Sequence, residues 1–251
     1  AAKSLSEAVD LLAKYRDQAR ILGGGTDLIV QVRENRRPVG VMVDIKGVPE
    51  VNTLSYNGSL EIGASVPCYK IYSNREVKSK FPALVDATSI IGGVQIQSRA
   101  SVGGNLCNAS PAADLLPPLL VHGARVLVAS QDRGEREVPL TDFVVGRRSI
   151  AREPDELVTG FSLDPVEEGT ADSYRKVGRR GAMEVAIVGV AVRLSVDSEA
   201  TIKEARVAVC SVGPVPFRAT AAEESLIGLT ADSDEVAAAG QLLLEQSQPI
   251  D

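Results

Sequence analysis

The sequence predicts an α+β protein of two domains, the first of which divides into two lobes. Near the N-terminus a short apolar strand, a glycine turn, a helix and a second apolar strand follow one another, which is the order of a βαβ unit. Later strand-like segments are short and antiparallel in character, with tight turns between them. A polar, acidic connector, DPVEEGTADS at 164–173, then separates two regions that each contain strands and helices.

The first lobe, about residues 1–50, is expected to be a small α/β unit. LSEAVDLLAKY has apolar side chains at helical spacing and predicts an amphipathic helix. RILGG predicts a short strand that stops at three glycines, and TDLIVQVREN restarts as a helix with Thr26 or Asp27 as its N-cap. VGVMVDI then predicts a buried strand, which completes the unit.

The second lobe is expected to hold a mixed or antiparallel sheet with helices. Asn57 and Gly58 form a hairpin turn signal between two short strands. Helices are expected at about 66–72 and 82–91, and ARVLVAS, REVPL and DELVTGFSL predict strands. Between them, SVGGNLCNASPAADLLPP at 101–118 contains so many small residues and prolines that neither helix nor strand is predicted there.

The C-terminal domain is expected to be a small α+β unit. AIVGVAVRLSV and EARVAVCSVG alternate as antiparallel strands around a turn near Asp197. TAAEESLIGL and SDEVAAAGQLLLEQ predict two helices. The predicted division is a first domain of residues 1–165, with lobes of about 1–50 and 51–165, and a C-terminal domain of residues 172–251.

Composition argues against several classes of function. The chain has 251 residues, a net charge of −6 and a pI of about 5.1, which argues against a nucleic-acid-binding surface. Basic clusters at Arg33, Arg36 and Arg37, and at 175–180, are interpreted as solvated faces. Three widely spaced cysteines indicate neither a disulfide framework nor a metal site, and favour a reducing, cytoplasmic location. No apolar run approaches the length of a membrane span.

Side chains suited to difficult chemistry are scarce. The single histidine, His122, offers little for a metal site or a histidine-based triad, and no nucleophile–base pair or carboxylate dyad is evident. We therefore predict no catalytic residue and no metal ligand. A bound cofactor is expected to supply the chemistry instead.

The glycine turn GGGTDL, at 23–28, lies between the first strand and the following helix. Glycines let the main chain approach a ligand closely, and a helix start with free N–H groups suits a phosphate. The turn lacks both the G-x-G-x-x-G spacing of dinucleotide-binding motifs and the lysine of a P-loop. A plain structural turn is therefore an equally good interpretation of this motif alone.

The segment 101–118 has the same character. Its glycine pair permits close approach, its amide and hydroxyl side chains can form hydrogen bonds, and its prolines lower the entropy cost of ordering it around a ligand. A structural loop is the alternative. Two such clusters favour a polyanionic ligand held twice, and a dinucleotide has the right shape. The candidate residues here are Gly103, Gly104, Asn105, Asn108, Ser110 and Asp114.

Together these motifs resemble a known family. GGGTDL followed by QIQSRASVGGNLCNASPAADLLPPLL is similar to the FAD-binding medium subunit of the molybdenum hydroxylases, such as xanthine dehydrogenase and carbon monoxide dehydrogenase. The run G-G-N-x-x-x-A-S-P-x-x-D is highly specific. The resemblance continues through YRKVGRRGAMEVAIVGVAV and ARVAVCSVGPVPFRATAAEESLIG, which look like the family's C-terminal domain, so it covers essentially the whole chain.

The resemblance implies FAD as the cofactor and assigns roles to residues. The first loop would wrap the FAD pyrophosphate, and the second would complete the pyrophosphate and ribityl contacts. Asp114 would accept hydrogen bonds from ribose hydroxyls, Leu157 would be an apolar pocket residue, and Arg175 or Lys176 would lie near the flavin ring. Tyr174 either packs nearby or is a buried structural tyrosine. The implied cofactor-binding residues of the first loop are Ile21, Leu22, Gly23, Gly24, Gly25, Thr26 and Asp27.

The resemblance also implies an electron-transfer role in a multi-subunit oxidoreductase. Electrons would come from a 2Fe-2S small subunit that serves a molybdopterin large subunit, and would pass to NAD, quinone or dioxygen. Gln97 departs from the arginine that members often carry before the second loop. Two alternatives stay open: a cofactor-free assembly module of the same fold, and a stand-alone FAD oxidase.

Overall fold

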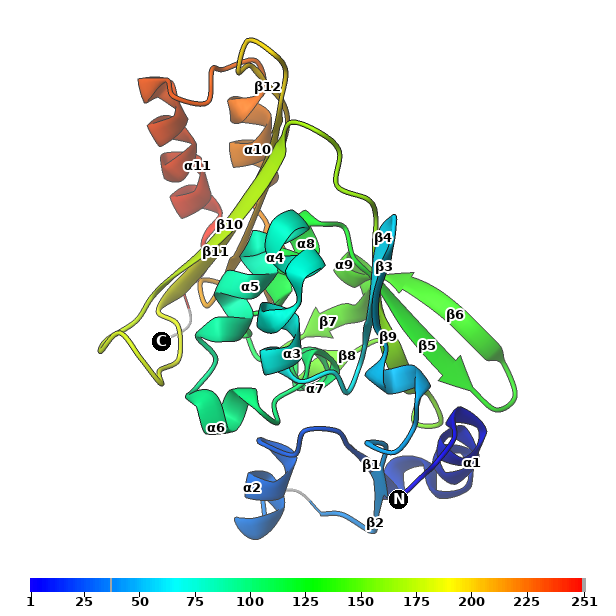
Figure 1. The fold of residues 1–251 in the computed structure, drawn as a ribbon. Coiled ribbons are helices and arrows are strands. Elements are labelled where there is room, and N and C mark those ends of the chain that lie inside the picture. The colour runs from blue at the N-terminus through cyan, green and yellow to red at the C-terminus, as the bar shows by residue number, and fades with distance from the viewer. Residues whose placement is uncertain (37, 250–251) are drawn as a thin grey trace.

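The computed structural model describes residues 1–36 and 38–249, so Arg37 of the first basic cluster lies outside the described residues. The chain forms an N-terminal part of two lobes and a C-terminal sheet with two helices beside it (Figure 1). Among the described residues, no helix has both the length and the apolar character needed to cross a bilayer.

The first lobe is the predicted βαβ unit with a preceding helix. Its elements are α1 (Leu5–Tyr15), a 3-10 turn (Arg16–Gln18), β1 (Ala19–Leu22), α2 (Leu28–Arg33) and β2 (Val41–Asp44). Strands β1 and β2 run parallel, with Ala19 opposite Val41. Ser4 caps α1 because its hydroxyl accepts a hydrogen bond from the Glu7 N–H at 3.2 Å. Asp27 is the N-cap of α2, as predicted, although its side chain accepts no capping hydrogen bond.

The second lobe is built on an antiparallel sheet of order β3-β4-β9-β5-β6. Its strands are β3 (Leu54–Asn57), β4 (Ser59–Gly63), β5 (Arg125–Ser130), β6 (Gly134–Pro139) and β9 (Leu157–Leu163), preceded by a 3-10 turn (Glu50–Asn52) and accompanied by the short pair β7 (Val144–Gly146) and β8 (Ser149–Ile150). Its helices are α3 (Cys68–Ser73), α4 (Arg75–Lys80), α5 (Pro82–Ser89), α6 (Val94–Gln97), α7 (Val102–Cys107), α8 (Leu116–Val121) and α9 (Leu140–Phe143).

The C-terminal domain is an antiparallel sheet of order β10-β11-β12-β13 covered by helices. Its elements are β10 (Thr170–Val177), β11 (Val188–Val196), β12 (Ile202–Cys210), β13 (Phe217–Arg218), α10 (Thr220–Leu226), a 3-10 turn (Asp234–Ala237) and α11 (Ala238–Gln246). Strands β11 and β12 meet around Asp197, and α10 and α11 are the two predicted C-terminal helices.

Two sequence expectations are corrected. The segment 101–118 contains the helix α7 and the start of α8, and Ser101 caps α7 by accepting from the Gly104 N–H at 3.2 Å. The prolines of α8 lie in its first turn, where a missing N–H costs no intrahelical bond. The acidic connector is also shorter than predicted, since β10 begins at Thr170 and pairs there with β11.

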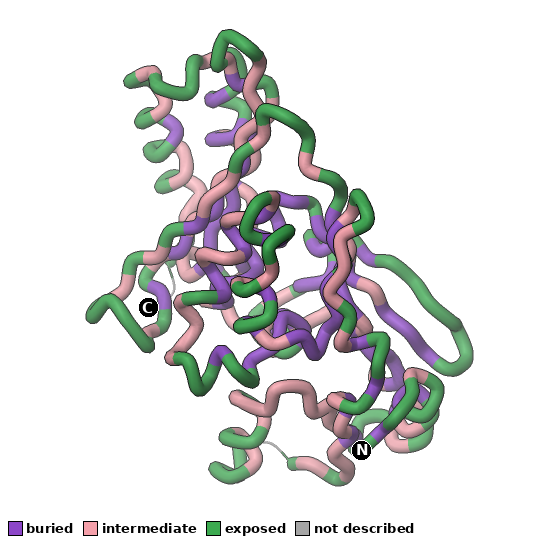
Figure 2. The backbone as a smooth tube through the Cα atoms, viewed as in Figure 1, coloured by how far each residue is buried: buried purple, intermediate pink, exposed green. Residues whose placement is uncertain are grey.

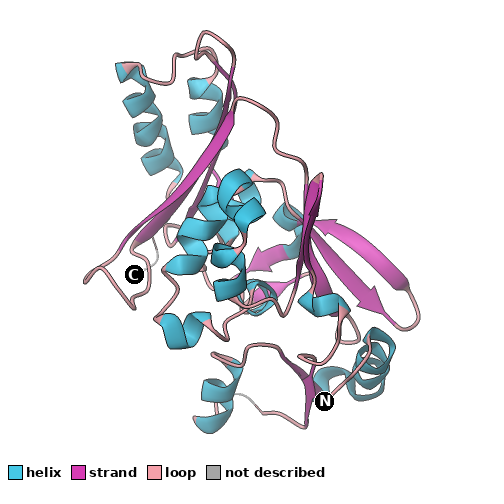
Figure 3. Cartoon of the chain, in the orientation of Figure 1, coloured by secondary structure: helices cyan, strands magenta, loops and turns pink. Residues whose placement is uncertain are grey.

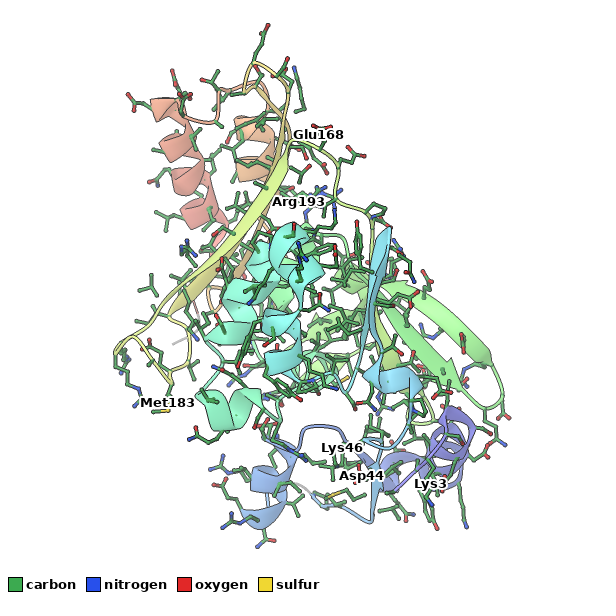
Figure 4. All side chains as sticks on the ribbon, in the orientation of Figure 1. Lys3, Asp44, Lys46, Glu168, Met183 and Arg193 are labelled. Atoms are coloured by element: carbon green, nitrogen blue, oxygen red, sulfur yellow. The ribbon has the colours of Figure 1, made fainter. Side chains whose placement is uncertain are left out.

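One large core fills the second lobe and extends into the C-terminal sheet, where Tyr174, Ala191 and Ala208 belong to it. A smaller apolar cluster lies between the sheet and the helices α10 and α11. Figure 2 shows the buried backbone concentrated where the two sheets and the helices α3 to α8 meet. The β10–β11 loop extends away from this core toward α6 (Figure 4). Met183 in this loop is largely exposed, and its sulfur lies 3.3 Å from a Cβ built on Gly93, the residue before α6.

The two domains are joined along the edge strand β10. The Asp86 carboxylate of α5 accepts from the Tyr174 N–H at 3.0 Å, so an edge amide of the sheet has a partner. In return, Asp172 on β10 accepts from the Ala83 N–H at 2.5 Å and lies 2.6 Å from His122 Nε2. The single histidine is therefore a buried contact between domains, which its sequence context did not indicate.

Candidate functional site

A cleft of about 310 Å³ lies between the two N-terminal lobes. Figure 3 shows that the short helix and strands of the first lobe lie beneath the helices of the second lobe. The turn between β1 and α2 lines one side of the cleft, and α6, α7 and the β7–β8 turn line the other. Leu157 and Val158 at the start of β9 also line it. The predicted residues that line the cleft are Ile21, Gly23, Gly24, Gly25, Thr26, Asp27, Gly103, Gly104, Asn105, Asn108 and Leu157.

The glycine turn packs directly against the backbone that precedes α7. A Cβ built on Gly24 would lie 1.9 Å from the carbonyl oxygen of Arg99, so only glycine fits at this position. Gly25 has a φ of +81°, in the left-handed region that favours glycine. The turn is therefore shaped by close approach at one residue and by backbone conformation at the next.

The glycine pair of α7 divides into a packing residue and an exposed one. A Cβ on Gly103 would lie 2.6 Å from the Ala64 Cβ, which shows that Gly103 lets α7 pack against the residue that follows β4. Gly104 is exposed at the cleft. Beside it, the Asn105 Oδ1 atom is buried without a hydrogen-bond partner, and so is the Ser65 Oγ atom. Such groups are costly unless a ligand or water satisfies them.

Among the described residues, three arginines line the cleft, and neither glycine motif includes them: Arg20, Arg148 and Arg152. Asp27 is the one acidic residue among the described residues that line it. The cleft is thus locally positive although the chain carries a net charge of −6. Arg148 adjoins Arg147 in the sequence, but such a pair of basic residues is usually a solvated surface feature and does not by itself indicate a ligand site.

Asp114 and Lys176 do not line this cleft but meet each other in a buried polar cluster. The Lys176 Nζ lies 3.2 Å from the Asp114 carboxylate, whose other oxygen accepts from the Tyr174 hydroxyl at 2.8 Å. Burial raises the pKa of Asp114, while Lys176 and Tyr174 oppose that rise. Burial also raises the pKa of Tyr174, which packs within 3.7 Å of the Cys210 sulfur. Tyr174 is therefore buried and structural, one of the two expectations for it.

The other predicted residues are distributed as follows. Arg175 is 80% exposed and its guanidinium lies 3.2 Å from Asp86, so Arg175 and Lys176 point to opposite faces of β10. The Ser110 hydroxyl accepts from the Ala112 N–H at 3.3 Å and stabilises its own turn. The structure places Leu22, Ser110, Asp114, Arg175 and Lys176 outside the set of residues that line the cleft.

Two family models match the chain in succession. Residues 1–164 match the FAD binding domain in molybdopterin dehydrogenase, and residues 172–251 match the CO dehydrogenase flavoprotein C-terminal domain. The chain belongs to the FAD-binding medium subunits of the molybdopterin hydroxylases.

Relatives of this medium subunit agree in sequence and fold. The xanthine dehydrogenase FAD-binding subunit of Escherichia coli O157:H7 is 31% identical, over 99% of this chain and 85% of the relative. The carbon monoxide dehydrogenase structure from Hydrogenophaga pseudoflava has a TM-score of 0.93 at 26% identity, covering 100% of this chain and 86% of that one. Quinoline 2-oxidoreductase from Pseudomonas putida 86 has a TM-score of 0.91 at 26% identity, covering the same shares.

The residues of this medium subunit fit FAD. Asn105, which lines the cleft, carries a buried oxygen atom without a partner, and the arginines give the cleft a charge opposite to that of a diphosphate. These features suit a dinucleotide, which has a diphosphate at its centre and hydroxyl groups on both sides of it. The expected cofactor, FAD, is confirmed by the family.

Proposed function

We propose that the chain binds FAD in the cleft between its N-terminal lobes and transfers electrons within a molybdenum hydroxylase complex. The observation that carries this proposal is the meeting of two distant glycine segments at one cleft. Residues 23–27 and 103–108 are far apart in sequence, yet Gly24 lies against the backbone of Arg99, next to the second segment. Family membership supplies the cofactor class, and the cleft supports the proposed location.

The residues of the cleft have separate tasks in this proposal. The backbone of Gly23, Gly24 and Gly25 holds the diphosphate, because N–H groups without side chains can approach it closely. The unpartnered Asn105 Oδ1 accepts from a cofactor hydroxyl. Leu157 provides an apolar wall. When bound, FAD accepts and releases electrons, and the chain positions it and controls its surroundings.

Of the two cations on β10, we assign Lys176 to the flavin side. Its side chain is 7% exposed and its ammonium lies 3.2 Å from Asp114 in the segment 101–118, whereas Arg175 is 80% exposed and pairs with Asp86 on α5. Asp114 then acts by holding the ammonium group in place. Each Asp114 oxygen has one protein donor and can accept a further hydrogen bond, so the expected contact with a ribose hydroxyl stays part of the proposal.

The partners in this proposal are a 2Fe-2S small subunit, which donates electrons, and a molybdopterin large subunit, on which substrate is oxidised. The support is that relatives are described as the FAD-binding subunit of a xanthine dehydrogenase and as the medium chain of a carbon monoxide dehydrogenase. The acceptor is NAD, quinone or dioxygen. The predicted division into domains of residues 1–165 and 172–251 is part of the same proposal.

The test is to purify the full chain, record its visible spectrum, remove any flavin and titrate FAD back. We expect flavin absorption and one FAD bound per chain. Asn105→Ala should weaken FAD binding, and Arg147→Ala, in an exposed turn, serves as the control with an unchanged fold. A chain that ignores added FAD would support a cofactor-free assembly module instead. Co-purification from the native host would identify the partner subunits.

A further inference from the structure

Arg148, in the turn between β7 and β8, lies at the cleft although neither glycine motif includes it. Its backbone has a φ of +60°, in the left-handed region. For a residue with a long side chain this conformation costs roughly 1 kcal/mol or more, and it persists only where surrounding contacts maintain it. The structure shows which contacts these are.

The contacts that maintain the turn come from the end of α7. The Arg148 N–H donates to the Ala109 carbonyl at 2.9 Å, and its Nη1 donates to the Asn108 carbonyl at 3.2 Å and also to the Asn108 Oδ1. The β7–β8 hairpin is thereby attached to the segment that carries the second glycine motif. Because Oδ1 of Asn108 accepts from Arg148, the part of this amide left for a ligand is its NH₂ group, a donor.

Arg148 is also the most exposed of the three cleft arginines. The Arg152 Nη1 donates to three backbone carbonyls, at 2.6 to 3.4 Å, which holds that side chain to its own loop. The Arg20 Nη1 donates to two carbonyls, and its Nε is buried without a hydrogen-bond partner. In the described contacts each of the three arginines donates through Nη1 alone, so exposure distinguishes Arg148: it is exposed at the cleft, whereas Arg20 and Arg152 are half-buried. A guanidinium has five N–H donors, so donors remain for an anion.

We propose that Arg148 binds the diphosphate of FAD and, through Asn108, turns a second donor toward the same group. This inference rests on the proposed function, since it assumes that the cleft is the FAD site. The two donors suit a phosphate because both offer N–H groups and one carries a positive charge. Arg148 thus supplies the charge that the glycine turn, with no lysine, lacks.

The experiment measures the Kd of FAD for the full-length apoprotein across a range of salt concentrations. The variants are Arg148→Ala, Arg148→Gln and Arg148→Lys, with Arg147→Ala as the matched control. Arg147 is an exposed neighbour in the same turn that is absent from the described lining of the cleft, and its replacement changes the net charge equally. Circular dichroism and the melting temperature of each variant report the fold.

We expect Arg148→Ala to raise the Kd about 10- to 100-fold at low salt, since hydrogen bonds between charged partners are among the strongest in proteins. The difference should shrink as salt rises, because counterions screen the diphosphate. Arg148→Gln keeps a donor for Asn108 but no charge, so it should lose the salt dependence and retain more affinity than alanine. Arg148→Lys should keep the salt dependence.

Two outcomes would overturn the proposal. One is an Arg148→Ala Kd that matches that of Arg147→Ala. The other is a loss of affinity by the same factor at every salt concentration, which would indicate packing of the hairpin alone. If Arg148→Ala does not fold, the salt dependence of the Kd of Arg148→Gln is compared with that of Arg148→Lys, and equal salt dependences would overturn the proposal. A wild-type chain that binds no FAD would instead refute the proposed function.

Discussion

Gly24→Ala tests the close approach between the glycine turn and the second lobe. The Cβ of an alanine at position 24 would lie 1.9 Å from the Arg99 carbonyl oxygen, and real Cβ atoms essentially never come within 3.0 Å of such an atom. The glycine turn and the backbone at Arg99 must therefore separate by about 1 Å. The Arg99 side cannot yield easily. The carbonyl of its neighbour Ala100 accepts from the Cys68 N–H at 2.9 Å, and the Arg99 N–H donates to the Ile96 carbonyl at 2.9 Å.

The turn must therefore move, and its backbone donors move with it. Losing one or two hydrogen bonds to a charged diphosphate costs about 2–4 kcal/mol, or roughly a 30- to 1,000-fold rise in the Kd of FAD. Crowding at the contact should also lower the free energy of unfolding by about 1–3 kcal/mol. A flavin fluorescence titration measures the first quantity and urea denaturation the second.

Gly240→Ala is the matched control. Gly240 is exposed in α11, has a negative φ and has no atom within 4 Å of a Cβ built on it. The same substitution there should raise the free energy of unfolding by about 0.5–1 kcal/mol and leave FAD binding unchanged, because alanine favours a helix. If Gly24→Ala binds FAD within twofold of the wild type, the glycine turn does not hold the cofactor in the way proposed.

Two further changes address buried polar contacts. Tyr174→Phe removes a hydrogen bond to the Asp114 carboxylate and should lower the free energy of unfolding by about 1–3 kcal/mol in urea, whereas a neutral result would mean that the hydroxyl contributes nothing. Arg136→Met leaves Glu156, 2% exposed, without its bidentate partner and should cost about 3 kcal/mol at pH 7. Burial raises the pKa of Glu156, but hydrogen bonds from Arg136 and the Glu153 N–H, together with the nearby arginine charges, outweigh burial and lower this pKa. The ionised Glu156 therefore stabilises the fold above the ordinary pKa of a glutamate, and this contribution is lost as the pH falls through the lowered pKa. The wild type should therefore lose stability in acid more steeply than Arg136→Met, and parallel pH profiles would contradict this.

Local sequence signals predicted the parts of the molecule that local forces determine. The strand, glycine turn, helix and strand of the first lobe follow from periodicity and from glycine conformations. The alternation of side-chain types along β11 and β12 likewise follows from a sheet in which successive side chains point to opposite faces. In the segment 101–118 the same reasoning was wrong, because small residues and prolines are typical of loops unless a cap and a first-turn position accommodate them.

The tertiary contacts of the site had no local signal. Asn108 and Arg148 are brought together by the path of the chain through α8, β5, β6, α9 and β7, and no spacing in the sequence indicates this. Asp114 and Lys176 belong to different domains, and each looked like a candidate ligand contact by itself. Their pairing depends on how β10 lies against the N-terminal part. Composition and motifs therefore located the glycine turns well and the charged residues poorly.

The central position of β9 has a consequence for the order in which the protein can be made. β9 pairs with β4 on one side and β5 on the other, and its first residues, Leu157 and Val158, form part of the cleft wall. During synthesis both glycine segments emerge long before this strand does. Contacts so distant in sequence form late and slowly. The chain must therefore be extended past Leu163 before a complete FAD site exists, so cofactor loading should be a late event in its biogenesis.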